Sequence, residues 1–159
     1  MEIVKINKDD NLAVKKLIHN VMPEFGAKGD GFALSDPEVE NMYMQYSQPR
    51  HIYFVVKDGD NVYGGGGIGP LNGEEEEVCE LRKMYFMPEL RGKGYGQKLM
   101  ELCLEEAQRL GFKKCYLETL EHMKQAKSLY EKNGFKKLNA PLGNTGHHGC
   151  NNWYLKDLI

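Results

Sequence analysis

The stretch ELRKMYFMPELRGKGYGQKLM (residues 80–100) combines a strand, a proline and a glycine-rich loop that opens a helix. The run VCELRKMYF (78–86) is predicted to be a strand that ends before Pro88. The loop RGKGYG (91–96) leads into GQKLMELCLEEAQRLG (96–111), which has the apolar spacing of an amphipathic helix. The start of a helix offers free N–H groups and a positive dipole end to an anion. We therefore expect this loop to bind a phosphate group.

The spacing of the glycines excludes two common nucleotide-binding loops. A Walker A loop requires a lysine followed by serine or threonine, whereas Lys93 is followed by Gly94. The dinucleotide fingerprint GxGxxG does not fit, because Gly92, Gly94 and Gly96 lie two residues apart. Arg91 and Lys93 add positive charge, which favours an anion site. A tight strand-to-helix turn without a ligand is the alternative.

The rest of the chain alternates between helical and strand patterns. Helices are predicted over residues 11–22, 36–49, 96–111 and 122–135, and strands over 51–56, 62–71, 78–86, 113–119 and 150–158. This order is typical of an α/β layer fold. The length of 159 residues favours one domain spanning residues 1–159.

Composition excludes several classes of protein. A net charge of -2 gives no general attraction to nucleic acid or to an acidic membrane. No run approaches the roughly 20 apolar residues of a membrane span, and the N-terminus has no signal-peptide core. We therefore expect a cytoplasmic protein with neither nucleic acid nor membrane as a partner. The cysteines form no CxxC pair and are expected to be reduced, partly as core residues: Cys79, Cys103, Cys115 and Cys150.

The stretch of residues 80–100 resembles the coenzyme A loop of the GCN5-related N-acetyltransferase (GNAT) family. In that family a strand and a proline precede Arg or Gln, two variable residues, Gly, one variable residue, and Gly or Ala. Arg91, Gly94 and Gly96 match the three fixed places. The segment AKSLYEKNGF (126–135) is similar to the family's helix and turn after the fifth strand. In order of elements, the resemblance covers about residues 52–138.

The resemblance implies a GNAT fold with acetyl-CoA as co-substrate. That fold has a mixed, mostly antiparallel, twisted sheet of about six to seven strands and about four flanking helices, splayed at strands 4 and 5. The fourth strand is expected to bulge there and hold the pantetheine arm, with the Phe86 amide facing the thioester carbonyl. The loop is expected to receive the pyrophosphate. The implied cofactor-binding residues are Met84, Tyr85, Phe86, Arg91, Gly92, Lys93, Gly94, Tyr95, Gly96 and Gln97.

Three residues are candidates for the chemistry. Tyr130 falls where many family members place the general acid that protonates the departing thiolate; alternatively, it is an amphipathic core tyrosine. Glu118, twelve residues earlier, and Glu80, on the fourth strand, are candidates for the base that deprotonates the amine, directly or through water. Each glutamate can instead pair with a basic neighbour. Alternation along the strand puts Glu80 on one face with Met84, up to the expected bulge.

Other residues are candidates for the acceptor pocket. His147 and His148 precede the last strand, where the family shapes that pocket. The alternative is a metal site formed by these histidines and Cys150. No second cluster of ligands accompanies them, so we expect no metal. The segment 23–50 is expected to form the opposite wall. Its candidate contacts are Phe32, Tyr43, Tyr46 and Arg50.

Two further features leave questions open. Met123 stands where family members often carry an asparagine that bonds the pantetheine, so that hydrogen bond is in doubt. The run Gly64–Gly67 lies inside a predicted strand, where glycine weakens pairing. It indicates either a flexible or bulged hairpin, or close approach by substrate or cofactor.

The sequence thus predicts an acetyl-CoA-dependent N-acetyltransferase that acts by direct transfer, without a covalent enzyme intermediate. The expected acceptor is a primary amine of a small molecule, such as an amino acid or a polyamine. The alternatives are a protein or peptide N-acetyltransferase, a non-catalytic acetyl-CoA sensor, and a nucleotide-binding module that uses the same loop. A homodimer would fit the family, in which dimers are common.

Overall fold

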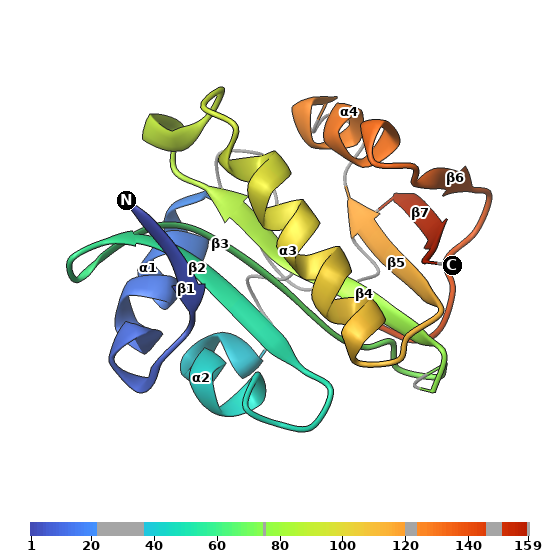
Figure 1. Cartoon of the computed structure of the whole chain (residues 1–159), viewed down its shortest axis with the longest axis horizontal. Helices are drawn as coiled ribbons and strands as arrows, with labels where there is room; N and C mark the ends of the chain where they lie inside the picture. The colour runs from blue at the N-terminus through green and yellow to red at the C-terminus, as the bar shows by residue number, and fades with distance from the viewer. Residues whose placement is uncertain (22–36, 75, 120–123, 146–150, 159) are drawn as a thin grey trace.

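A seven-stranded sheet with the strand order β1-β2-β3-β4-β5-β7-β6 forms the centre of the molecule (Figure 1). The computed structural model describes residues 1–21, 37–74, 76–119, 124–145 and 151–158. The strands are β1 (Glu2–Lys5), β2 (Ile52–Asp58), β3 (Asn61–Pro70), β4 (Val78–Phe86), β5 (Lys114–Thr119), β6 (Lys136–Leu138) and β7 (Asn152–Asp157). All neighbouring strands are antiparallel except β4 and β5, which are parallel. The predicted mixed, mostly antiparallel sheet is confirmed.

Helices cover both faces of this sheet. They are α1 (Asn11–Val21), α2 (Met42–Gln45), α3 (Tyr95–Arg109) and α4 (Lys124–Lys132), with the 3-10 turns η1 (Lys8–Asp10), η4 (Pro37–Asn41) and η5 (Pro88–Leu90). Residues of α1, η4 and α2 share one core cluster with β2, whereas α3 and α4 pack in another on the opposite face. Within the described residues, no helix has the length and apolar character needed to cross a membrane.

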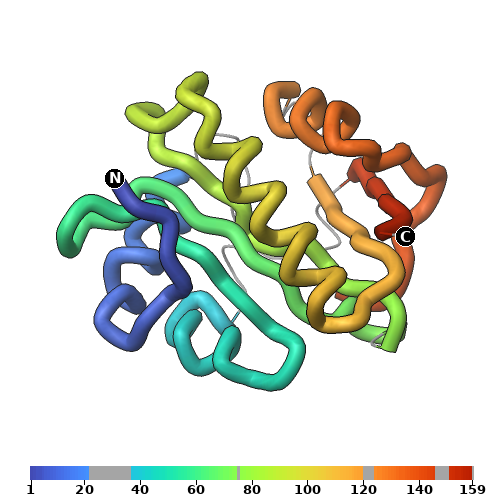
Figure 2. The backbone as a smooth tube through the Cα atoms, in the orientation of Figure 1, coloured from blue at the N-terminus to red at the C-terminus, as the bar shows by residue number. Residues whose placement is uncertain are grey.

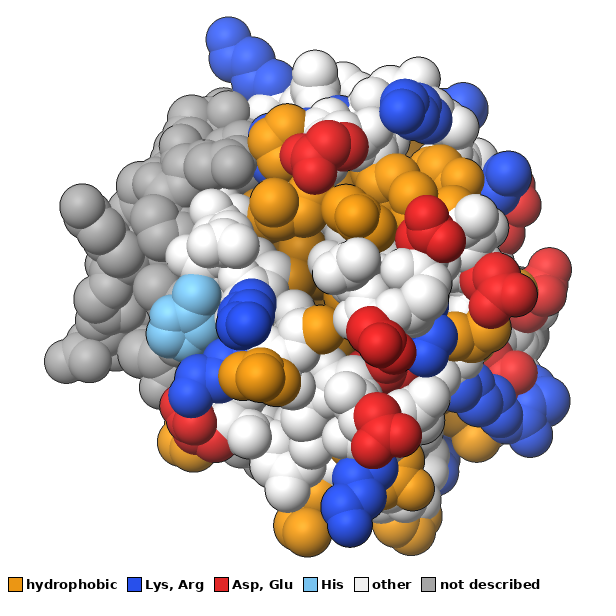
Figure 3. Space-filling view, turned by 90° about the vertical axis from the view of Figure 1, so that its left-hand side faces the viewer, with side chains coloured by type: hydrophobic (Ala, Val, Ile, Leu, Met, Phe, Trp, Pro, Cys, Tyr) orange, Lys and Arg blue, Asp and Glu red, His pale blue; other side chains and the backbone are white. Residues whose placement is uncertain are grey.

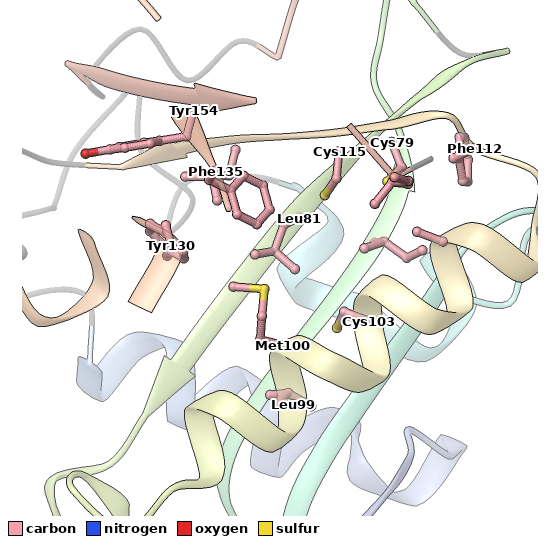
Figure 4. Close-up of a cluster of buried hydrophobic side chains, with 14 of the residues drawn as sticks. Cys79, Leu81, Leu99, Met100, Cys103, Phe112, Cys115, Tyr130, Phe135 and Tyr154 are labelled. Carbon is pink, nitrogen blue, oxygen red and sulfur yellow. The ribbon is translucent and has the colours of Figure 1, made fainter. Parts of the chain in front are cut away.

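The larger core lies between α3 and the sheet (Figure 4). Leu99, Cys103 and Ala107 recur at helical spacing on α3 and are fully buried, as the apolar pattern predicted. Cys79 and Cys115 face them from β4 and β5 as free thiols, and all three described cysteines are buried. Burial raises the pKa of the Cys103 thiol. These cysteines serve as small core residues, as expected.

Strands β4 and β5 run together at one end and separate toward the other (Figure 2). They pair only where Val78–Glu80 lies beside β5. Beyond that point β4 bulges. Arg82 pairs with Gly67 and Tyr85 pairs with Gly65, so β4 has two residues between these pairs where β3 has one. Lys83 is the extra residue, with a left-handed φ of 49°. A bulge strengthens the local twist, and here it accompanies the predicted parting of strands 4 and 5.

A row of glycines on β3 makes room for the side chain that holds this bulge. The Tyr53 hydroxyl donates a hydrogen bond of 2.7 Å to the Lys83 carbonyl at the bulge. A Cβ atom at Gly65 would lie 2.6 Å from the Tyr53 oxygen, and one at Gly67 would lie 2.3 Å from the Ile52 carbonyl oxygen. The hairpin is therefore bulged opposite Gly64–Gly67, and the groups that approach these glycines closely belong to the protein itself.

Charged groups of both signs are spread over the described part of the face seen in Figure 3. On the face seen in Figure 3, lysine, arginine and acidic side chains surround a central group of hydrophobic ones. No broad area of one sign covers the described part of this face. This distribution lacks the basic stripe that is typical of a nucleic-acid-binding surface.

Candidate functional site

A cavity of about 660 Å³, called the larger cavity, lies where β4 ends and α3 begins, with α4 as its other wall. Its lining residues are Val21, Met84, Tyr85, Phe86, Leu90, Arg91, Gly92, Gly94, Tyr95, Gly96, Gln97, Lys124, Gln125, Ala126, Leu129 and Tyr130. The structure thus brings together all the predicted cofactor-binding residues except Lys93, which is an exposed residue of the loop. It also adds Tyr130 to the same wall.

The glycine loop leaves the start of α3 open to a ligand. Gly92 and Gly94 have φ values of 76° and 86°, which side-chain-bearing residues rarely adopt. No atom lies within 4 Å of where a Cβ would stand at either position, so conformation alone favours glycine there. Gly94 is the N-cap of α3, and no side chain caps the helix. The N–H groups of the first turn, from Tyr95 onward, are therefore available to an anion in the larger cavity.

Two polar side chains of the loop hold the walls of this cavity together. Arg91 donates from Nε and Nη2 to the Phe86 carbonyl, at 3.0 and 2.8 Å, and so joins the loop to the end of β4. Gln97 and Asn133 exchange two amide hydrogen bonds of 2.9 Å, which join the start of α3 to the end of α4. The Gln97 side chain is committed to this pair, so its contact with a ligand would come from its backbone N–H.

The backbone of Phe86 is oriented as an oxyanion donor requires. The Met87 N–H donates to the Tyr63 carbonyl at 2.8 Å, which makes this a hydrogen-bonded pair of the β3–β4 ladder. In an antiparallel ladder the next residue points its N–H and carbonyl the opposite way. The Phe86 N–H therefore points away from β3, to the side where β4 has parted from β5.

The smaller cavity, about 220 Å³, lies on the other face of β4. Its lining residues are Pro37, Glu38, Gln45, Asn72, Glu80, Arg82, Lys83, Asn144 and Thr145. The bulge reverses the alternation of side chains, so the consecutive residues Arg82 and Lys83 line the smaller cavity and Met84 lines the larger one. The face that Glu80 was expected to share with Met84 therefore ends at the bulge, because one extra residue moves every later side chain to the opposite face.

Two buried ion pairs line the smaller cavity. Arg82 Nε donates to Glu80 Oε1 at 2.8 Å, and the side chains of the pair are 13% and 5% exposed. Lys83 Nζ contacts Glu38 Oε1, and Lys83 is buried. The Tyr46 hydroxyl donates to the same Glu38 oxygen at 2.9 Å. No local sequence pattern pointed to Glu38, because its partner Lys83 is 45 residues away along the chain.

Glu38 is held as a carboxylate by these neighbours. Burial raises its pKa, but the charge and hydrogen bond of Lys83, with the charge of Arg82, lower it by more, so the pKa lies below its usual 4.5. A depressed folded-state pKa stabilises the fold above the unfolded-state pKa, and this contribution is lost as the pH falls through the folded-state value.

Glu38→Gln should therefore lower the melting temperature most near neutral pH. The gap between wild type and variant should shrink as the pH falls below about 4.5. Thermal unfolding from pH 7 to pH 3 measures this gap, with Glu105→Gln, at an exposed position of α3, as the control. A gap that stays constant across this range would contradict the linkage.

The structure separates the other two predicted catalytic residues. Tyr130 on α4 lines the larger cavity, and its ring packs 6.1 Å from that of Phe135. Glu118 on β5 accepts hydrogen bonds from the Tyr116 hydroxyl at 2.7 Å and from Thr145 Oγ1 at 2.6 Å. Glu118 is absent from the lining of both cavities. It contacts the smaller cavity through Thr145, which lines that cavity.

The acceptor-wall candidates have different places. Arg50 packs over the Phe112 ring at 3.8 Å and donates to the Leu110 carbonyl, so it fixes the end of α3 and lines neither cavity. Tyr46 is buried and positions Glu38, and Tyr43 is partly exposed on α2. The remaining acceptor-pocket candidates lie outside the described residues: Phe32, His147 and His148. So do Met123, at the position of the family's pantetheine-bonding asparagine, and Cys150, named for the alternative metal site.

Comparison with known proteins places this geometry in a family. The sequence model described as "Acetyltransferase (GNAT) family" matches residues 16–135. An "Uncharacterized N-acetyltransferase YjgM" of Escherichia coli strain K12 is 44% identical over 155 residues, which are 97% of this chain and 93% of that protein.

Solved structures share the fold. A GNAT-family acetyltransferase of Staphylococcus aureus Mu50 superposes with a TM-score of 0.87 at 21% identity and covers 99% of both chains. The PaiA N-acetyltransferase of Thermoplasma acidophilum, in complex with coenzyme A, has a TM-score of 0.77 at 17% identity and covers 98% of both. At these identities the likeness concerns the fold.

Proposed function

The chain belongs to the GNAT family of acetyltransferases, and we propose that it transfers the acetyl group of acetyl-CoA directly to a primary amine of a small molecule, as one domain spanning residues 1–159. The observation that carries the proposal is the pair of cavities on the two faces of β4. One has a wall of backbone donors and the other a wall of charged side chains. Strand β4 separates the two cavities and parts from β5 beyond Glu80. At this opening, acetyl-CoA in one cavity would meet the amine in the other.

The larger cavity has the features that acetyl-CoA requires. The uncapped start of α3 after Gly94 would receive the pyrophosphate, and the side chains of Arg91 and Lys124 add positive charge to the same lining. The exposed end of β4, from Met84 to Phe86, would hold the pantetheine arm through its backbone. When bound, acetyl-CoA supplies the activated acetyl thioester; the chain supplies its position and the proton transfers.

Three groups would carry the chemistry. Glu80 removes a proton from the amine, directly or through water, as its nitrogen forms a bond to the acetyl carbon. The Phe86 N–H stabilises the negative charge that develops on the carbonyl oxygen. Tyr130 donates its proton to the sulfur as the carbon–sulfur bond breaks and later regains one from solvent. The products are the N-acetylated amine and coenzyme A.

We favour Glu80 over Glu118 as the base because Glu80 lines the acceptor-side cavity. Both oxygens of Glu118 accept hydroxyl hydrogen bonds, from Tyr116 and from Thr145. That arrangement suits a residue that positions Thr145 at the rim of the smaller cavity. A cavity of about 220 Å³ suits a small amine better than a protein segment, which would need an open groove.

Thermal unfolding in the presence of acetyl-CoA, coenzyme A or ATP tests the proposal. A ligand at about 100 times its dissociation constant that binds only the folded protein adds roughly 2.7 kcal/mol to the free energy of unfolding. We expect a rise in melting temperature with acetyl-CoA and coenzyme A and none with ATP. Mass spectrometry of reactions with a panel of amines then identifies the acetylated product. No rise with acetyl-CoA, or an equal rise with ATP, would argue against the proposal.

A further inference from the structure

We propose that the smaller cavity binds an amino acid, an amine that carries its own carboxylate, and discriminates against polyamines; this inference rests on the proposed function. The two basic and two acidic side chains of the lining, Glu38, Glu80, Arg82 and Lys83, sum to zero charge among the described residues. Buried charges that are kept in pairs around a cavity are costly to fold and call for a role beyond stability.

The arrangement of these charges along the cavity matches a zwitterion. Arg82 pairs with Glu80 on β4, and Lys83 pairs with Glu38 across the cavity wall on η4. Each carboxylate thus has a cation beside it, so an ammonium and a carboxylate of one small molecule can lie next to charges of opposite sign. The remaining lining side chains are mostly neutral amides and a hydroxyl, those of Gln45, Asn72, Asn144 and Thr145.

Charge balance favours this ligand at the moment of reaction. When Glu80 takes the amine proton, the charge of the described lining rises from zero to +1. An amino acid with a neutral amine carries −1 on its carboxylate, so the sum returns to zero. A polyamine would retain positive charge on its other nitrogens and add to the excess, and like charges held close together in a partly buried site repel one another.

The step conserves atoms and charge. Glu80 first takes one proton from the bound ammonium and passes it to solvent. The neutral amine nitrogen then bonds to the acetyl carbon and gives a second proton to Glu80, and the thioester carbon–sulfur bond breaks as Tyr130 protonates the sulfur. An N-acetyl amino acid and coenzyme A leave the site, and both protein groups exchange protons with solvent. No further reactant is required.

Matched acceptors test the inference with the full chain and acetyl-CoA. Each L-amino acid is compared with its amide and its decarboxylated amine, and spermidine is included; products are measured by mass spectrometry. For the best amino acid we expect kcat/KM at least about tenfold above that of its amide, the size of one charge-assisted hydrogen bond. Amides, simple amines or spermidine acetylated as efficiently would overturn the inference and leave the proposed function standing. Acetyl-CoA binding without acetylation of any amine would overturn the inference as well.

A double variant tests whether the Glu38–Lys83 ion pair causes the preference for an amino acid over its amide. Glu38→Gln with Lys83→Met removes one negative and one positive charge, and we expect the advantage of the amino acid over its amide to fall severalfold. The matched control is Lys15→Met with Glu40→Gln, an ion pair of 2.7 Å between α1 and η4 that lies outside both cavities. The control should keep the advantage, and both variants should bind acetyl-CoA. An unchanged advantage in the Glu38–Lys83 variant would overturn the assignment.

Discussion

Replacing Tyr130 by phenylalanine should lower kcat by about 10²- to 10⁴-fold, the usual contribution of a positioned general acid. Tyr130 lines the larger cavity and is buried against Phe135 and Tyr154, so the phenylalanine ring keeps the packing and removes the proton donor. Binding of acetyl-CoA should change little, because the proposed contacts with it come from the loop and the end of β4. Steady-state kinetics and calorimetric titration with acetyl-CoA measure the two effects separately.

The control is Tyr154→Phe. The ring centroid of Tyr154 lies 6.0 Å from that of Tyr130; Tyr154 is also buried and is absent from the lining of the larger cavity. This variant loses the same hydroxyl atom without losing a donor at the proposed site, so its kcat should stay close to that of the wild type. Equal activity of the Tyr130 variant and the wild type would remove Tyr130 from the mechanism and make it a core residue only.

Gly67→Ala should cause the largest loss of stability, about 3 kcal/mol, at the upper end of the usual cost of overpacking. The new Cβ would stand 2.3 Å from the Ile52 carbonyl oxygen and 2.9 Å from the Tyr53 Cα, both backbone atoms of the paired strand. Backbone in a central strand cannot shift without disturbing its ladder. Displacement of Tyr53 would also release the Lys83 carbonyl, so activity should fall together with stability. Urea unfolding measures the loss.

Gly66→Ala is the matched control in the same row. Its nearest neighbours would be the methyl ends of Met84 and Leu99, at 3.1 and 3.2 Å, which can rotate away, and the Met84 Cβ at 3.2 Å, which needs to move by only a few tenths of an ångström. The gain from a less flexible unfolded chain offsets part of the contact strain, so the loss should stay below about 1 kcal/mol. Equal losses in the two variants would show that the close approach at Gly67 has no special energetic weight.

Local patterns predicted most of the elements but missed the shortest. Strands β1 (Glu2–Lys5) and β6 (Lys136–Leu138) have only four and three residues, too few for alternation to be visible. They are strands because β2 and β7 offer them ladder partners. The resemblance to the family predicted the number of strands, although it assigned neither of these two to residues.

The sequence by itself determined the cofactor side of the protein. Residues 84–97 are contiguous, and their strand, turn and helix signals act over a few residues, so the loop and the open start of α3 follow from local chemistry. Only the tertiary structure decided the proposed acceptor side, the smaller cavity. The Lys83–Glu38 pair joins residues 45 apart, and the side chains of Arg82 and Lys83 share one face because a bulge, held by Tyr53 across the β3 glycines, shifts the register. Register depends on how strands distant in sequence fit together, and a one-residue shift moves each following side chain to the opposite face.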